Sequence, residues 1–403
     1  IGAGVFGAMQ ALEASQRGLK VLLIEKNDFG SGASANSLKT IHGGLRYLQN
    51  LDVRSSIISA KERKAWLTIA PDLVRPLPCI LPTTKELMKS KLVVGAGTLF
   101  YNFLTIGRNL KMTKDALIPS AHLISLSALN QRLPKLVDSD ITGGACWFDA
   151  QAINTERLVL SIVLAAKQLG ARVENYQKIG RLVKKGRSFQ VQLAASQKHT
   201  AVLCSAKYVV DCSGRASYLE KEYLTLLKGE RKSVSVFVKA VNLVIKKKIS
   251  NYAFGIKAKD DSGMARLLFT APWQSSSLGE DYTLIGTWYF DDTKESNSLS
   301  PVEFEQCITQ INSAFQEPVC TREDVVQVHI GFLPADPEII ESKGPDASLL
   351  KHAKLNDWSE SNKCHEGLYT LKGTKFTLAR KAAEETVNTL QKKFNLNLSN
   401  YQS

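Results

Sequence analysis

The spacing of apolar residues predicts a helix followed by a buried strand at the start of the chain. Apolar positions recur at helical spacing through Ala8, Leu12 and Ala14, and Gly18 ends that helix. The four-residue apolar run 21–24 that follows is typical of a strand buried in a parallel sheet. Helical spacing returns in the segments 52–70, 123–136, 155–169, 300–315 and 378–392. Either Asp149 or Asn154 can cap the helix 155–169.

Strand patterns dominate the second half of the sequence. Apolar residues alternate from Val234 to Val238 and from Val241 to Ile245, and again in the segments 267–269 and 282–290, which predicts one antiparallel sheet. Further strands are predicted at 77–81, 173–176, 207–211, 325–330 and 364–371, and a hairpin turn at 184–188. With 403 residues, the chain is long enough for two domains with separate cores.

Composition narrows the class of protein. The hydrophobic fraction of 44% and the charged fraction of 22% are ordinary values for a globular protein. The seven cysteines stand singly, without a C-x-x-C pair or a Cys/His cluster, so we expect reduced thiols and no metal site. The net charge of +14 suits an anionic ligand or an anionic membrane surface. No nucleic-acid-binding module is recognisable, so nucleic acid is not an expected partner.

A glycine motif opens the sequence. Gly2, Gly4 and Gly7 have the spacing G-x-G-x-x-G. In that pattern the first glycine allows a tight turn, the second lets the backbone approach a pyrophosphate, and the third lets the helix pack closely on a strand. Glu25 ends the following strand, where its carboxylate can accept from a ribose hydroxyl. This order of elements predicts a dinucleotide site, for either NAD or FAD. Since such a fold needs a strand before the first glycine, we expect residues to precede Ile1.

The segment 30–48 favours a flavin. It is rich in Gly and Ser and carries Lys39, His42 and Arg46. Such a loop can place backbone and hydroxyl donors along a pyrophosphate and a flavin edge, which an NAD domain does not require.

The sequence GSGASANSLKTIHGGLRYL (30–48) resembles the flavin-binding loop of the FAD-dependent glycerol-3-phosphate dehydrogenases, within the D-amino-acid-oxidase-like flavoproteins. The resemblance recurs in the segments 147–171, 208–217, 267–289 and 373–384 and therefore covers most of the chain. It implies an α/β protein with a Rossmann-like FAD-binding domain (1–75, 141–230 and 362–403) and a second, mixed-sheet (α+β) substrate domain (76–140 and 231–361). Family members often carry a helical C-terminal domain, and we expect a divergent member that lacks it.

The resemblance implies FAD as cofactor and a set of residues around it. The loop opened by Gly373 is expected to begin the last helix and to present amides and a positive dipole end to the flavin. The expected cofactor-binding residues are Gly2, Gly4, Gly7, Glu25, Lys26, Ser34, Ser37, Lys39, His42, Gly43, Gly44, Leu45, Gly214, Gly373, Thr374, Lys375 and Phe376.

Arg46, Tyr47 and Lys375 match residues that lie near the substrate in the resembled family, and they are the expected catalytic residues. Two departures stand out. Leu333 occupies the position of the family's phosphate-binding arginine, and no histidine occurs between 200 and 328, where the family has a candidate base. Either another cation, such as Arg75 or Lys239, replaces the arginine, or the substrate differs.

Three functions remain open at this point. The first is oxidation of a secondary alcohol, as in glycerol-3-phosphate dehydrogenases, by hydride transfer to FAD with electrons passed to a quinone. The second is oxidation of a hydroxy acid or an amine by a related oxidase or dehydrogenase. The third is a flavin-binding paralogue without robust catalysis. In each case the expected partner is a small anionic or polar molecule.

The segment 92–107 is apolar and has basic residues on both sides: Lys85, Lys89, Lys91, Arg108, Lys111 and Lys114. Sixteen residues are too few to span a bilayer comfortably. The segment is therefore either a buried helix of the substrate domain or an interfacial helix among anionic headgroups. We expect a cytoplasmic protein that could lie at the inner face of the cell membrane through a peripheral contact.

Overall fold

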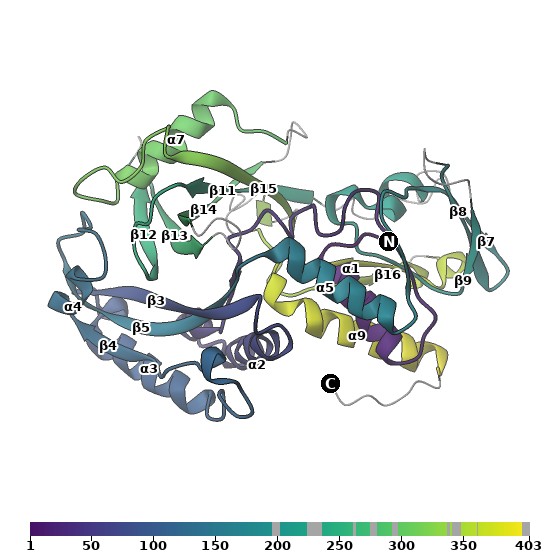
Figure 1. Ribbon diagram of the computed structural model, residues 1–403, viewed down its shortest axis with the longest axis horizontal. Helices are drawn as coiled ribbons and strands as arrows, with labels where there is room; N and C mark the ends of the chain where they lie inside the picture. The colour runs from purple at the N-terminus through teal and green to yellow at the C-terminus, as the bar shows by residue number, and fades with distance from the viewer. Residues whose placement is uncertain are drawn as a thin grey trace.

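The computed structural model describes residues 1–195, 202–223, 236–260, 263–274, 280–291, 297–336, 339–340, 348–360 and 362–396. Two regions of sheet lie side by side along the long axis of the molecule, with helices packed over both (Figure 1). The fold is of the mixed α/β class expected from the sequence.

The glycine motif lies in a sheet made from distant pieces of chain. β1 (Leu22–Ile24) pairs in parallel with β6 (Arg172–Glu174), and β10 (Val209–Asp211) pairs in parallel with β17 (Leu368–Lys372), which continues to β16 (Lys354–Asp357). The first two residues join these pairs. The Ile1 ammonium donates to Val210 O and Gly2 N donates to Ile24 O, both at 2.8 Å. Residues 1–2 therefore hold the central position between β1 and β10.

Three helices cover this sheet. α1 (Val5–Gln16), α5 (Thr155–Gln168) and α9 (Ala379–Phe394) lie next to one another in Figure 1, although they come from the start, middle and end of the chain. Small and branched side chains on their facing surfaces, such as Ala8, Val159 and Ala383, are fully buried together. Asn154 caps α5 by accepting from Arg157 N, so Asp149 is not the cap.

A second, larger sheet lies beside the sheet that holds the glycine motif (Figure 1). In the described residues its path runs β15-β11-β14-β13-β12-β3-β5-β2, with β4 on β5. The strands are β2 (Thr40–Ile41), β3 (Val74–Thr84), β4 (His122–Ser125), β5 (Ile141–Ala152), β11 (Val236–Ile245), β12 (Ala253–Lys259), β13 (Ala265–Gln274), β14 (Asp281–Asp291) and β15 (Val325–Ala335). α7 (Pro301–Asn312) covers one side, and its apolar face packs into the core of this sheet (Figure 1). A separate three-stranded sheet contains the predicted hairpin, β7 (Ile179–Lys185) and β8 (Ser188–Leu193), with β9 (Leu203–Ala206).

Most predicted helices form close to their expected bounds. α2 spans Val53–Ile69 and is capped by Asp52, α3 spans Lys91–Leu104 and is capped by Ser90, and α7 begins with a capping box at Ser300. Among the residues described, no helix combines the length and the apolar character needed to cross a bilayer.

Two local predictions are wrong. The segment 123–136 is not one helix, because His122–Ser125 pairs with residues 143–146 of β5 and only α4 (Leu126–Asn130) is helical. The strand predicted at 364–371 begins at Leu368, after the 3₁₀ turn η8 (Lys363–His365). The last helix, predicted at 378–392, forms as α9 from Ala379, and the 3₁₀ turn η9 (Phe376–Leu378) separates it from Gly373. Val234 lies outside the described residues. The division into two domains remains a prediction. The predicted bounds assign β2 and β5 to the FAD-binding domain, but both strands share the larger sheet with β3 and β11.

Candidate functional site

The turn between residue 1 and α1 requires glycine at two positions. Gly2 has φ +83°, and a Cβ on it would lie 2.6 Å from Ser213 Cα. A Cβ on Gly7 would lie 1.8 Å from the carbonyl oxygen of Gly2. The helix therefore packs directly on the turn, which is the close approach that the third glycine of a dinucleotide motif provides.

Gly4 has a different role from its neighbours. It is the N-cap of α1 with ordinary extended angles, and a Cβ on it would meet only Ser34 Oγ, at 3.1 Å. Ser34 Oγ accepts a hydrogen bond from Val5 N at 2.9 Å, so the 30–48 loop reaches the helix N-terminus. Glycine is thus not needed here for folding, and the space beside it suits a phosphate at the positive end of the helix.

Glu25 lies at the end of β1 beside the glycine turn. Its carboxylate accepts hydrogen bonds from Ala3 N and Asn27 N, both at 2.8 Å. The carboxylate is partly exposed and has further lone pairs, so it can also accept from a ribose hydroxyl. Lys26, the next residue, is exposed.

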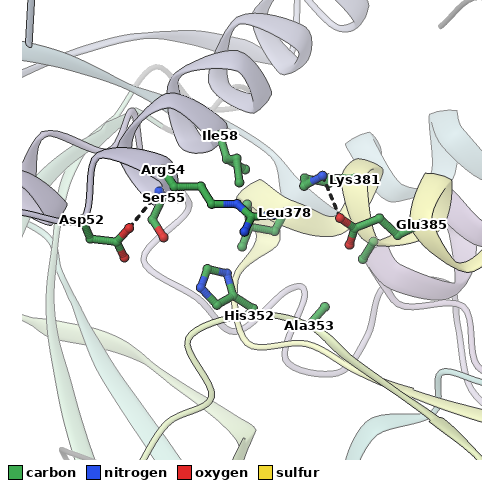
Figure 2. A pocket seen from close by; sticks show the side chains of 10 residues that line it. Asp52, Arg54, Ser55, Ile58, His352, Ala353, Leu378, Lys381 and Glu385 are labelled. Atoms are coloured by element: carbon green, nitrogen blue, oxygen red, sulfur yellow. Dashed lines mark hydrogen bonds and ion pairs between the residues drawn. The ribbon is translucent and has the colours of Figure 1, made fainter. Parts of the chain in front are cut away.

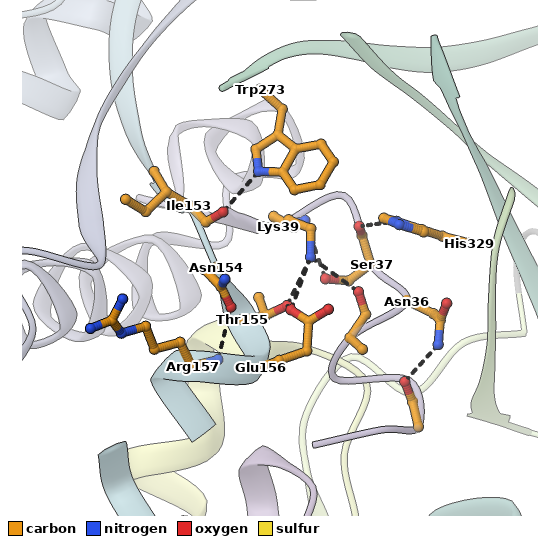
Figure 3. A network of polar contacts seen from close by, with 12 residues as sticks. Asn36, Ser37, Lys39, Ile153, Asn154, Thr155, Glu156, Arg157, Trp273 and His329 are labelled. Carbon is orange, nitrogen blue, oxygen red and sulfur yellow. Dashed lines mark hydrogen bonds and ion pairs between the residues drawn. The ribbon is translucent and has the colours of Figure 1, made fainter. Parts of the chain in front are cut away.

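Lys39 is buried within the loop (Figure 3). Its ammonium donates to Thr155 Oγ1 at 2.9 Å and Ala35 O at 3.2 Å, and it lies 3.4 Å from a carboxylate oxygen of Glu156. Ser37, two residues earlier, accepts from Lys39 N through its hydroxyl and faces His329 through its carbonyl. The structure therefore brings these two predicted residues together, with Lys39 directed at protein groups of α5.

The double glycine is held by a buried carboxylate. Asp149 of β5 accepts from Gly43 N at 2.7 Å, and its other oxygen lies 3.1 Å from Nδ1 of His42. Burial opposes ionisation of Asp149, yet its hydrogen bond to His42 and the charges of His42 and Arg63 hold its pKa below the usual value. The sequence pattern around Asp149 indicated only a possible helix cap. A single acid within the predominantly apolar strand segment 144–152 is the signal that could have revealed its role.

A second set of buried groups supports the same loop. Tyr101 of α3 donates its hydroxyl to Gly43 O at 2.8 Å and accepts from Arg63 Nη1 at 3.1 Å. Arg63, which is 1% exposed, also donates to Phe148 O. Gly44 follows with φ +92° and starts the 3₁₀ turn η1 (Leu45–Asn50), so Leu45 is its first residue. The backbone around His42 is therefore fixed on both sides.

The expected catalytic residues are only partly brought together. The Lys375 ammonium donates to Tyr47 Oη and lies 4.7 Å from the centre of the Tyr47 ring. Arg46 is on the same turn as Tyr47 and is exposed. Thr374 binds Leu350 O through its hydroxyl, and the Phe376 ring packs on Trp66. Lys375 and Tyr47 thus form a pair at the junction of η1 and η9.

Two further predicted glycines lie at close approaches or turns. A Cβ on Gly373 would lie 2.0 Å from the ring of Phe6, within the glycine motif of α1. Gly214 has φ +62° and begins the turn η4 (Gly214–Ala216) after β10, and a Cβ there would have open space around it. Both positions place backbone beside the N-terminal turn, where a dinucleotide would lie.

The described residues form a pocket of about 300 Å³ (Figure 2). It is lined by Asp52, Arg54, Ser55, Ile58, His352, Ala353, Leu378, Lys381, Ala382 and Glu385. It lies between the start of α2 and the start of α9. Its lining residues Asp52 and Leu378 follow Tyr47 and Lys375 closely along the chain. It does not include the glycine turn, so it is not the dinucleotide site.

The residues present fit a dinucleotide. The turn leaves no room for side chains at Gly2 and Gly7, Gly4 leaves space at the helix N-terminus, and Glu25 supplies a ribose acceptor. Fold and site together define a dinucleotide-binding α/β protein with a second, larger sheet beside the first. The family is given by a match of residues 1–387 to the family model for DAO, FAD dependent oxidoreductase, and the chain therefore belongs to this family. Its cofactor is FAD.

Similar proteins agree with this assignment. The chain is 30% identical to a mitochondrial glycerol-3-phosphate dehydrogenase of Mesocricetus auratus, over 98% of this chain and 53% of that protein. It is 28% identical to a glycerol-3-phosphate dehydrogenase of Synechocystis, over 96% of this chain and 68% of that protein. The chain spans about half the length of the mammalian glycerol-3-phosphate dehydrogenases it matches.

Solved structures share the fold. The FAD-complexed glycerol-3-phosphate dehydrogenase of Bacillus halodurans matches with a TM-score of 0.70 and 22% identity, over 99% of this chain and 64% of that chain. Glycine oxidase of Geobacillus kaustophilus matches with a TM-score of 0.65 and 15% identity, over 97% and 93%. The fold is thus common to enzymes named for an alcohol and for an amine substrate.

Proposed function

We propose that this chain oxidises a secondary alcohol of a small anionic or polar molecule, as glycerol-3-phosphate dehydrogenases do, and passes the electrons to a quinone. The observation that carries the proposal is the pair of His42 and Asp149 beside the double glycine. The identity of about 30% to glycerol-3-phosphate dehydrogenases along nearly the whole chain supports the substrate class.

FAD, when bound, supplies a hydride acceptor for the carbon that bears the hydroxyl. The hydroxyl proton needs a base, and His42 is suited to that role. With Nδ1 directed at the Asp149 carboxylate, the neutral imidazole carries its proton on Nδ1 and leaves Nε2 as the acceptor. The buried carboxylate also stabilises the imidazolium that forms. The base that the segment 200–328 lacks is therefore proposed at position 42.

The substrate's negative charge would meet Arg46, Tyr47 and Lys375. The ammonium of Lys375 and the hydroxyl of Tyr47 are already paired, and Arg46 lies exposed on the same turn. Lys239 does not suit the role of the missing arginine, because its ammonium lies 3.6 Å from Glu303 of α7 and donates to Ser298 O. Arg75, on β3, is exposed and remains available.

A second candidate function is oxidation of a hydroxy acid or an amine. Leu333 lies two residues after Gly331 on β15, and Gly331 packs against Ala33 and Asn36 of the flavin loop. Since alternate residues of a strand share a face, Leu333 is directed to the same side as the loop. An apolar side chain there favours a substrate end without a phosphate. A flavin-binding paralogue without robust catalysis is the third candidate.

Anaerobic reduction of the flavin separates these candidates. The purified holoprotein is mixed with glycerol 3-phosphate, with hydroxy acids and with small amines, and the loss of absorbance near 450 nm is followed. The proposal expects glycerol 3-phosphate to reduce the flavin and a soluble quinone to reoxidise it. Reduction by another class alone would establish the second candidate, and reduction only by dithionite would establish the third.

We also propose that α3 contacts an anionic membrane surface at the inner face of the cell membrane. Leu99, Phe100 and Phe103 are 72%, 45% and 66% exposed, whereas Thr98 and Tyr101 are buried against the protein. The helix is thus neither fully buried nor able to span a bilayer. Lysines and arginines on both sides can meet anionic headgroups, and each contributes on the order of 1 kcal/mol near such a surface.

Vesicle flotation tests the membrane proposal. Charge reversal at Lys89, Lys91 and Lys111 should weaken binding to anionic vesicles and flatten its dependence on salt. Replacing Phe100 and Phe103 by Ser should weaken binding even at low salt, because the apolar contribution is lost. Wild-type protein that stays off anionic vesicles at low salt would refute the contact.

A further inference from the structure

The ammonium of Lys39 is a buried charge beside the flavin loop, and it is not needed for the proton transfer assigned to His42. The Lys39 side chain is 1% exposed, and its contacts come from three elements (Figure 3). Thr155 and Glu156 of α5 lie at one side, Ala35 O lies within the loop, and the ring of Trp273 from β13 lies 5.1 Å away. Trp273 is fixed in turn, because its indole N–H donates to Ile153 O.

Two titratable groups face this ammonium. Burial lowers the pKa of Lys39, and the carboxylate of Glu156 opposes that change. Burial, followed by the charge of Lys39, lowers the pKa of His329 on β15 to about 4, so this imidazole is neutral at pH 7. Glu156 is therefore the one negative charge among the groups described here that balances Lys39.

Glu156 is held in place for this contact. Thr155 donates its hydroxyl to the Glu156 carboxylate at 2.8 Å, and the same hydroxyl accepts from Lys39. Although burial opposes ionisation of Glu156, the neighbouring Lys39 ammonium keeps its pKa below the usual value. The opposite side of the Glu156 side chain is open to solvent, so its charge can be removed by substitution without opening a cavity in the core.

We propose that Glu156 is a positioning residue that sets the reduction potential of the bound flavin through the ammonium of Lys39. The proposal rests on FAD as cofactor and on the expected place of Lys39 at the flavin. Two-electron reduction adds negative charge to a flavin, and a nearby fixed cation stabilises that charge. The Glu156 carboxylate offsets part of this effect and holds the cation at α5. Removing the carboxylate should therefore favour the reduced flavin.

The test is the flavin midpoint potential of the holoprotein, measured by spectroelectrochemistry at pH 6. Lys39→Met should lower the potential, and Glu156→Gln should raise it. A tenfold change in the ratio of oxidised to reduced flavin corresponds to about 30 mV for this two-electron couple, and each variant should reach that size. Arg157→Gln is the matched control, because it removes an exposed charge from the same turn of α5 and should leave the potential unchanged.

The double variant decides whether Glu156 acts through Lys39. In the Lys39→Met background, Glu156→Gln should cause no further shift. A pH series adds a second readout. Without the carboxylate, Lys39 loses its proton at lower pH than in the wild type, so the rise in potential caused by Glu156→Gln should fade as pH increases.

Two results would overturn the proposal. One is a shift from Glu156→Gln that persists undiminished when Lys39 is Met, because the effect would then bypass the ammonium. The other is an unchanged potential in Lys39→Met, because the ammonium would then lie too far from the flavin. Both results concern the potential of bound flavin, so they are distinct from failure of the proposed function, which would appear as wild-type holoprotein whose flavin is not reduced by substrate.

Discussion

Substitutions at Gly4 and Gly7 should separate cofactor binding from folding. The two glycines lie in one motif but meet different surroundings. At Gly4 the backbone angles are ordinary, and an added Cβ would meet only the hydroxyl of Ser34, at 3.1 Å. That hydroxyl can rotate away. The largest expected loss is its hydrogen bond from Val5 N, worth about 0.5–1.5 kcal/mol.

At Gly7 the added atom would lie 1.8 Å from the carbonyl oxygen of Gly2, which is backbone and cannot rotate away. The turn or the helix must therefore move. The loss in the free energy of unfolding should be at least about 1–3 kcal/mol, the range typical of overpacking. Gly4→Val should therefore fold nearly as well as the wild type but should not bind FAD, because its side chain occupies the space that a pyrophosphate needs. Gly7→Ala, in contrast, should be less stable to unfolding than the wild type.

The assay has two parts for each variant. Urea unfolding of the FAD-free protein gives the change in the free energy of unfolding, and absorbance after incubation with FAD and gel filtration gives the bound flavin per chain. Stoichiometric flavin on Gly4→Val would refute the assignment of the phosphate site. Equal stability of Gly7→Ala and the wild type would refute the reasoning on the turn.

Three further predictions concern buried ionisable groups. His329 has a pKa of about 4 in the folded protein against 6.5 when exposed, so the unfolded state gains a proton first as pH falls. The free energy of unfolding should therefore decrease by about 3 kcal/mol between pH 6.5 and pH 4. His329→Leu should remove this part of the acid sensitivity when unfolding is measured at pH 7 and pH 4. Asp149→Asn should slow flavin reduction by substrate by about 100-fold or more at unchanged FAD content, because His42 loses the carboxylate that orients it; unaltered stopped-flow rates would contradict the role of His42 as base. Arg380→Leu should destabilise the fold by about 3 kcal/mol in thermal unfolding, because it leaves the carboxylate of Glu62 buried without its bidentate partner, and adding Glu62→Gln should recover part of the loss.

The sequence by itself determined the elements whose causes are local. Gly7 is required by a clash with the carbonyl oxygen of Gly2, five residues earlier, and Gly2 has a positive φ that favours glycine. The helices capped by Asp52, Asn154 and Ser300 follow from side chains that bind amides three residues on. The family resemblance rested on the same short-range motifs, and the match to residues 1–387 confirmed the family and its cofactor.

Only the tertiary structure decided what depends on contacts between distant segments. The start of the helix predicted at 123–136 is instead the strand β4, because β5 offers backbone partners that local spacing does not reveal. Asp149 meets His42 across 107 positions, and Glu156 meets Lys39 across 117. A sequence motif can predict that a lysine lies near a cofactor. Whether its charge is balanced, and by which carboxylate, depends on which helix the fold packs against it, because an electrostatic interaction depends on separation in space and not along the chain.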